Sequence, residues 1–173
     1  PAMMRVGFGV TALCKGLAGG GSDGIGNYTL EMLRQFGVRD DLSLVPFAFG
    51  QAVAGEVLSE LNNSGITLGR YPLNAAWSAA TSLNFFGIDR LNQKVDLIHA
   101  TDHYVPKCSP VPLVATLMDA IPLSHPHWSR GNHRGLKNAL WVRAANWADQ
   151  IITISEYSKL ELAKWTGISL NKI

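Results

Sequence analysis

The chain has 173 residues, of which 47% are apolar and 16% are charged, and its formal net charge is +2 at pH 7. This length and composition predict one packed globular domain and exclude a disordered tail. The small net charge provides no broad basic surface, so nucleic acid is not expected as a partner.

The N-terminal part begins with a buried strand expected at residues 6–11, where small and β-branched residues alternate. A glycine-rich loop follows, with six glycines within residues 16–26, and apolar residues at helical spacing then predict a helix at residues 27–37. Residues 42–49 predict a second strand. Pro46 in this strand indicates an edge position, because proline cannot donate a hydrogen bond to a neighbouring strand.

The middle of the chain continues with a helix expected at residues 53–61 and a short strand at residues 66–68. The next helix, at residues 73–86, has few polar residues and is therefore expected to be packed on both sides. Residues 95–100 and 112–118 are continuous apolar runs, which are typical of strands buried on both faces of a parallel sheet.

The last elements are a helix at residues 135–148 and a strand at residues 150–155. Ser155 is expected to cap a final helix at residues 156–165, which ends at Gly167. The alternation of strands and helices predicts a doubly wound, mostly parallel Rossmann-like α/β sheet with helices on both faces. Ligands are expected at the carboxyl ends of its strands.

The compartment is inferred from cysteines and from targeting signals. Cys14 and Cys108 lack the spacing of metal ligands and are expected to be free thiols in a reducing compartment. No signal peptide is visible, and residues 1–3, ahead of Met4, are expected to be vector-derived. The most apolar window, residues 73–88, is interrupted by Asn, Ser and Thr and is too short to span a bilayer. These features predict a cytoplasmic protein.

A strand, a run of glycines and a helix N-terminus together predict an anion site, because backbone N–H groups and the helix dipole favour negative charge there. Gly24 and Gly26 lie just before Asn27, so a phosphate can approach the backbone without meeting a Cβ atom. A flexible surface loop is the alternative. The Walker pattern of phosphate-binding loops is absent. Residues 7–12 match the glycine pattern of dinucleotide-binding sites, but they lie inside the first strand, and the second strand does not end in the acidic residue that would bind a ribose hydroxyl. An NAD-dependent oxidoreductase is therefore only a third possibility.

Four segments resemble the N-terminal domain of the family 4 retaining glycosyltransferases, enzymes with the two-domain GT-B fold. They are "GGGSDGIGNYTLEML", "VDLIHATDHYVP", "PLVATLMDAIPLSHP" and "ADQIITISEYSKLELAKWTGISLNKI". Their order and spacing match along nearly the whole chain. The resemblance implies that residues 4–170 form the acceptor-side half of a GT-B fold and that residues 171–173 begin the connection to a donor-binding domain. Without that second domain the fragment is expected to be inactive.

The resemblance also implies roles for particular residues. His103 matches the family's histidine close to the transferred sugar and is preferred to His99, which is expected to be satisfied within the core. The family's Thr-x-His-Asp pattern has Met118 in place of its histidine here, while Asp119 is kept. The residues implied near the donor diphosphate are Gly20, Gly21, Gly24 and Gly26, and those implied in acceptor binding are Asn27, Tyr28, Asp119 and Ser155.

The function expected from this resemblance is retaining transfer of a hexose from a nucleotide-sugar to a growing bacterial glycan, such as a lipopolysaccharide or another lipid-linked glycan. Mannose from GDP-mannose is the first candidate donor. No Asp-x-Asp pair is present to hold a metal, so a metal-independent enzyme without cofactor is expected, and no carboxylate pair indicates glycoside hydrolysis. A non-catalytic sugar- or nucleotide-binding module of similar fold is the alternative.

A basic helix face is a possible membrane contact. Arg130, Arg134, Lys137 and Trp141 share this face, which could rest on anionic lipid at the inner face of the plasma membrane and so suit a lipid-linked acceptor. An ordinary solvated helix face is the favoured alternative.

Overall fold

The computed structural model describes residues 3–21, 23–61, 63–128 and 134–173 of the chain. Within them lies a six-stranded sheet of order β3-β2-β1-β4-β5-β6 in which every neighbouring pair is parallel. This arrangement confirms the predicted doubly wound, Rossmann-like fold. The strands are β1 (Met4–Gly9), β2 (Leu42–Phe49), β3 (Ile66–Leu68), β4 (Leu97–Ala100), β5 (Leu113–Thr116) and β6 (Gln150–Ile152).

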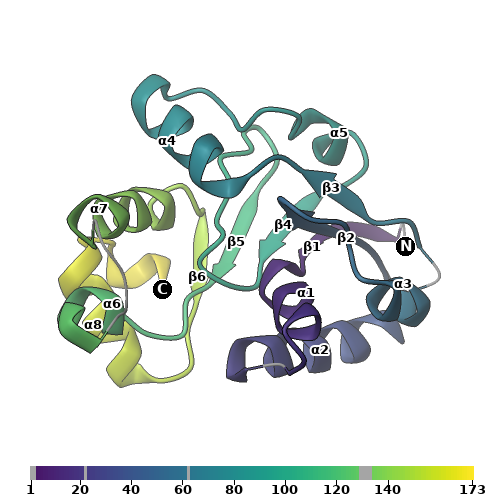
Figure 1. Cartoon of the computed structure of the whole chain (residues 1–173), viewed down its shortest axis with the longest axis horizontal. Helices are drawn as coiled ribbons and strands as arrows, with labels where there is room; N and C mark the ends of the chain where they lie inside the picture. The colour runs from purple at the N-terminus through teal and green to yellow at the C-terminus, as the bar shows by residue number, and fades with distance from the viewer. Residues whose placement is uncertain (1–2, 22, 62, 129–133) are drawn as a thin grey trace.

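Helices connect these strands and cover both faces of the sheet (Figure 1). The α-helices are α1 (Thr11–Ala18), α2 (Gly24–Gly37), α3 (Gly55–Leu61), α4 (Tyr71–Thr81), α5 (Asp89–Asn92), α6 (Ile121–Ser124), α7 (Arg134–Ala145) and α8 (Glu156–Thr166). Short 3-10 helices span Pro126–Trp128 and Leu170–Lys172.

The alternation of side chains along β1 and β2 divides the core into two layers. Phe8 and Leu44 point to the layer covered by α1, α2 and α3, whereas Phe47 and Phe49 point to the layer covered by α4 and α5. Gly7 also faces the second layer. A Cβ atom there would lie 3.2 Å from side chains of β4 and α5, so this glycine serves close packing.

Helix α1 is an element that the sequence analysis does not predict. Strand β1 ends at Gly9, and Thr11 already begins the helix, where its hydroxyl accepts a hydrogen bond of 3.1 Å from the N–H of Phe49. The apolar residues of α1, Leu13 and Cys14, are buried against the core. The glycine loop therefore follows an eight-residue helix and not the strand itself.

The prediction that Pro46 marks an edge strand is wrong, because β2 lies between β1 and β3. Only the part of β2 that contains Pro46 resembles an edge strand. Strand β3 begins only opposite Phe47, so the missing N–H of Pro46 faces no ladder partner. The Leu44 carbonyl, two residues earlier, instead accepts a hydrogen bond from the Asn63 side chain at 2.6 Å.

Helix α4 is shorter and less buried than predicted. It ends at Thr81, where Ser82 adopts a left-handed conformation with φ of 62°. Ala75 and Ser78 are buried, but Leu73 and Trp77 are exposed, so only one side of the helix is packed. The predicted packing on both sides is therefore wrong.

Helix α8 agrees with the prediction at both ends. Its N-cap is Ser155, which accepts a hydrogen bond from the Ser158 N–H at 3.1 Å, and its C-cap is Gly167 with φ of 71°. Among the described residues, no helix is long and apolar enough to cross a membrane.

His99 lies on β4 inside the core, as predicted. Its Nε2 is 2.9 Å from the Thr116 hydroxyl, and its ring packs edge-on against Phe8. Burial lowers the pKa of His99 from its ordinary value of 6.5 to about 4. Because protonation is then favoured only in the unfolded chain, the stability due to neutral His99 is present above pH 6.5 and is lost as the pH falls toward 4.

We therefore expect the free energy of unfolding to fall between pH 7 and pH 4.5, with His99 contributing about 2 kcal/mol to that fall. Replacement His99→Gln keeps a hydrogen-bonding group but cannot titrate, so it should remove this contribution in urea unfolding. The exposed His127→Gln is the matched control and should keep the wild-type pH dependence. An unchanged slope in His99→Gln would show that His99 does not cause it.

Candidate functional site

The site is built around the segment that follows β4, at the carboxyl edge of the sheet. Asp102 in this segment is buried, and its carboxylate accepts hydrogen bonds from two backbone N–H groups, that of Tyr104 at 2.7 Å and that of Ala12 at 3.2 Å. Burial raises the pKa of Asp102, while His103, the two amides and Lys15 oppose this shift. The carboxylate thus ties the β4 segment to the start of α1.

His103 follows directly and is half-buried, with its ring tilted over the Tyr104 ring at a centroid distance of 4.2 Å. Burial lowers the pKa of His103; Lys137 and Lys15 lower it further, whereas Asp102 and Asp23 raise it. The result is a neutral imidazole near pH 7, which can both donate and accept a hydrogen bond.

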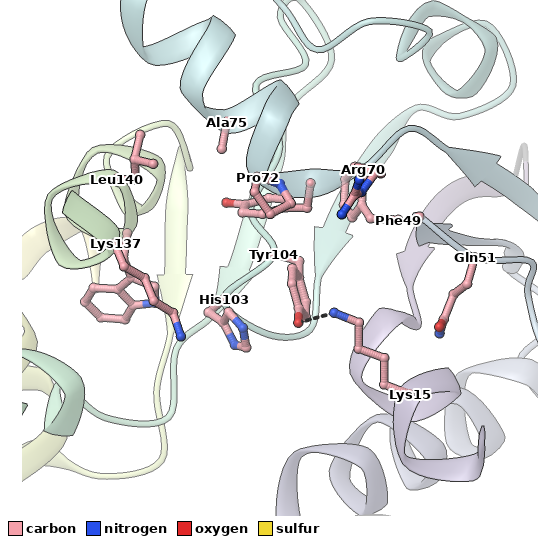
Figure 2. A pocket seen from close by; sticks show the side chains of 13 residues that line it. Lys15, Phe49, Gln51, Arg70, Pro72, Ala75, His103, Tyr104, Lys137 and Leu140 are labelled. Carbon is pink, nitrogen blue, oxygen red and sulfur yellow. Dashed lines mark hydrogen bonds between the residues drawn. The ribbon is translucent and has the colours of Figure 1, made fainter. Parts of the chain in front are cut away.

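A cavity of about 440 Å³ opens beside His103. It lies between the carboxyl ends of β2 and β4 and the helices α1, α4 and α7 (Figure 2). Its lining residues are Lys15, Phe49, Gly50, Gln51, Arg70, Tyr71, Pro72, Ala75, His103, Tyr104, Lys137, Leu140 and Trp141. Its size is in the range of small-molecule sites.

The cavity carries three cations from three different helices or their caps. Lys15 belongs to α1, Arg70 is the N-cap residue of α4, and Lys137 belongs to α7. Figure 2 shows Lys15 and Lys137 reaching toward the His103 and Tyr104 pair from opposite sides. Lys15 donates a hydrogen bond to the Tyr104 hydroxyl, and its Nζ lies 4.2 Å from the centre of that ring.

Aromatic side chains fix the wall of the cavity. Tyr71 packs edge-on against Tyr104 at a centroid distance of 5.1 Å and against Phe49 at 5.3 Å. Its hydroxyl donates to the Val105 carbonyl at 3.0 Å, and burial raises the pKa of Tyr71 far above its usual range. These contacts connect α4 to the β4 segment, so the start of α4 and His103 hold a fixed relation.

The glycine loop contains less free backbone than the sequence suggests. The N–H groups of Gly20 and Gly21 donate to carbonyls of α1, at 3.2 and 3.0 Å. The N–H of Gly26 donates to the carboxylate of Asp23, the N-cap of α2, at 2.9 Å. Gly24 is exposed, and nothing lies within 4 Å of the place a Cβ atom would take there. A diphosphate role for this loop stays a prediction, centred on Gly24.

The loop lies at the same edge of the sheet as His103, because α2 is anchored there. The Tyr28 hydroxyl is 3.2 Å from that of Thr116 at the end of β5, and the Thr29 hydroxyl is 3.2 Å from that of Thr101 after β4. The Tyr28 hydroxyl thus contacts the same threonine that binds His99 inside the core.

The other acceptor candidates hold local structure. Asp119 accepts a hydrogen bond from the Ile121 N–H at 2.9 Å at the start of α6, and Ser155 caps α8. Asn27 is exposed on the first turn of α2, where its N–H donates to the Asp23 carbonyl at 2.9 Å. None of these three lines the cavity described above, and their roles in acceptor binding stay predictions.

Part of the basic helix face expected to meet lipid also lines the cavity. Lys137, which is exposed, and Trp141 are both lining residues, and the contact of this face with a membrane stays a prediction. Arg130 lies outside the described residues, and the side chain of Arg134 is not described either. In the part of the chain that the structure describes, no group of three or more His, Cys, Asp and Glu residues could hold a metal ion.

Several residues of the site carry no motif that sequence reasoning uses. Asp102 and Tyr104 flank His103 in the segment that resembles the family, just after a buried strand, but no motif gives either of them a role. Lys15 and Arg70 lie on segments that only the fold brings together, so nothing in their local sequence indicates the site.

The sheet order defines a Rossmann-like domain, and a ligand-sized cavity lies at the carboxyl edge of its sheet, where such domains bind ligands. The family model for Glycosyltransferase Family 4 matches residues 22–173, and the chain belongs to this family. It is therefore a glycosyltransferase domain that acts with a sugar donor and an acceptor. A search of curated proteins finds no match for the chain.

We expect Asp102→Asn to lower the free energy of unfolding by about 2 kcal/mol, because the new amide NH₂ faces a backbone N–H and leaves it without an acceptor. Urea unfolding at neutral pH measures the change. The exposed Asp40→Asn is the control and should have no measurable effect. Equal stability of the two variants would mean that the buried carboxylate does not hold the segment.

Proposed function

We propose that this chain is the acceptor-side domain of a retaining hexosyltransferase that uses a nucleotide-sugar. In this proposal His103 contacts the transferred sugar, and the acceptor occupies the cavity beside it. The observation that carries the proposal is the position of His103, which is half-buried at the cavity wall with its ring packed on Tyr104, the residue whose backbone N–H donates to the Asp102 carboxylate. A side chain fixed in this way can orient a sugar without rearranging.

The chemistry suits a neutral histidine. Retaining transfer develops positive charge on the sugar ring while the diphosphate leaves with negative charge. A neutral His103 can hydrogen-bond a sugar hydroxyl without adding a positive charge next to that ring. Lys15 and Lys137, which lower its pKa, favour this neutral state.

GDP-mannose is the first donor to test, and a bacterial surface glycan, including a lipid-linked one on the cytoplasmic side of the membrane, is the first class of acceptor. We expect transfer to need no metal. The remaining donor contacts are assigned to a second, nucleotide-binding domain, so assays of transfer require the longest natural form of the protein that contains these residues.

In that form, we expect His103→Ala to lower the rate of sugar transfer about a hundredfold, the loss expected for one positioned hydrogen-bonding group in a transition state. Initial rates with radiolabelled donor measure the effect. His127→Ala, which removes an exposed histidine outside the cavity, should keep full activity. Transfer at the wild-type rate in His103→Ala would remove the assignment of His103.

The glycine loop has a sharper test at Gly24. It is the first residue of α2 and has open space around it, so Gly24→Ala should leave the free energy of unfolding unchanged or raise it by a few tenths of a kcal/mol. If the donor diphosphate approaches this backbone, the added methyl group should raise the KM for the donor about tenfold.

The matched control is Gly55→Ala. Gly55 is likewise the first residue of its helix, α3, with nothing within 4 Å of its added Cβ atom, and it does not line the cavity. This variant should keep the wild-type KM. Equal KM values for both variants would show that the donor diphosphate does not approach Gly24, and the glycine run would then be only a connection between helices.

A further inference from the structure

The cavity is lined by cations and by no acidic residue. Lys15, Arg70 and Lys137 form no ion pair with any residue that the structure describes, and none of the lining residues is Asp or Glu. A cavity lined by charge of one sign concentrates its field and attracts a ligand of the opposite sign.

Two carboxylates lie close enough to act on the charges of this site, but neither lines the cavity. Asp102 is buried and offsets part of the charge of Lys15 while its two oxygens accept backbone N–H groups, and Asp23 caps α2 through Gly26. The cavity therefore keeps an excess of positive charge.

The backbone adds to this charge at the start of α4. Arg70, Tyr71 and Pro72 line the cavity, so the N-terminal end of this eleven-residue helix faces it. No side chain caps that end, and a helix N-terminus carries partial positive charge. Gly50, with φ of 71°, turns the chain after β2 so that it passes beside the Arg70 backbone.

An uncommitted donor lies in the same wall. Nε2 of Gln51, a residue that lines the cavity, is buried and finds no hydrogen-bond acceptor in the described part of the chain. A buried donor without an acceptor is costly, and a bound oxyanion would supply the acceptor.

We propose that this cavity binds a phosphoryl group carried by the acceptor, so that the enzyme extends a phosphorylated sugar or glycan. The proposal rests on the proposed function, which places the acceptor here. A phosphate monoester carries a charge of about −1.5 to −2 at neutral pH. It therefore matches three cations and a helix N-terminus better than a single carboxylate does. Arg70 can contact two phosphate oxygens at once, and the aromatic wall of Tyr71 and Tyr104 suits the attached sugar.

Calorimetric titration of the 173-residue chain tests this with four probes: glucose 1-phosphate, methyl glucoside, glucuronate and GDP. We expect glucose 1-phosphate to bind at least about tenfold more tightly than methyl glucoside or glucuronate, and its affinity to fall as salt is raised. Arg70→Gln and Lys137→Gln should each weaken its binding about tenfold, the usual loss for one hydrogen-bonded charge. Arg90→Gln, which removes an exposed cation on α5, is the control and should bind as the wild type does.

Equal binding of the charged and neutral sugars, or binding that Arg70→Gln and Lys137→Gln leave unchanged, would overturn the proposal. So would GDP that binds at least as tightly as glucose 1-phosphate and loses affinity in the same two variants, because the cavity would then serve the donor. These titrations measure binding and do not depend on sugar transfer. The role of His103 is tested independently by the rate measurements.

Discussion

The buried carboxylate of Asp102 is the constraint on which the site depends. It joins the segment after β4 to the first turn of α1, two elements that are 90 residues apart in the chain. Because one oxygen accepts the N–H of Tyr104 and the other that of Ala12, the carboxylate sets where Tyr104 stands and where α1 begins. Lys15 follows one turn along α1 and meets Tyr104 again through its hydroxyl and its ring. One side chain thus positions a histidine, a tyrosine and a lysine at one end of the cavity.

The same edge of the sheet shows how its charges are divided. Asp23, Asp102 and Asp119 each accept hydrogen bonds from backbone N–H groups near helix starts. Such bonds stabilise the helix starts. Lys15 and Lys137 form no salt bridge with any described residue, although the buried Asp102 offsets part of the charge of Lys15. At this edge of the sheet the acidic residues therefore stabilise the fold, whereas the basic residues remain available to a ligand.

Most of the fold could be predicted from the sequence because a parallel sheet leaves a strong local signal. Residues 42–49 and 66–68 form strands at the predicted bounds, since a strand buried on both faces is a continuous apolar run. Helix α1 was missed because glycines near its end masked the helical spacing of its apolar residues. The prediction for Pro46 is wrong because the register of β3 against β2, which leaves Pro46 without a ladder partner, is not encoded near Pro46.

The candidate site could be predicted only where a single residue type at a strand end indicates a function. His103 stands at the end of β4, so its position at the edge of the sheet follows from the strand order, and it also matches a known family pattern. The glycine run predicts free backbone N–H groups, but whether such a group is free depends on its hydrogen-bond partners. Here carbonyls of α1 and the Asp23 carboxylate accept three of the four N–H groups implied near the diphosphate.

Arg70 and Lys137 show the opposite case. Each looks like an ordinary surface cation in its own segment, and only the packing of α4 beside α7 brings both to one cavity. The charge of a site is therefore a property of the fold, which is why the acceptor could be inferred only after the helices were in place.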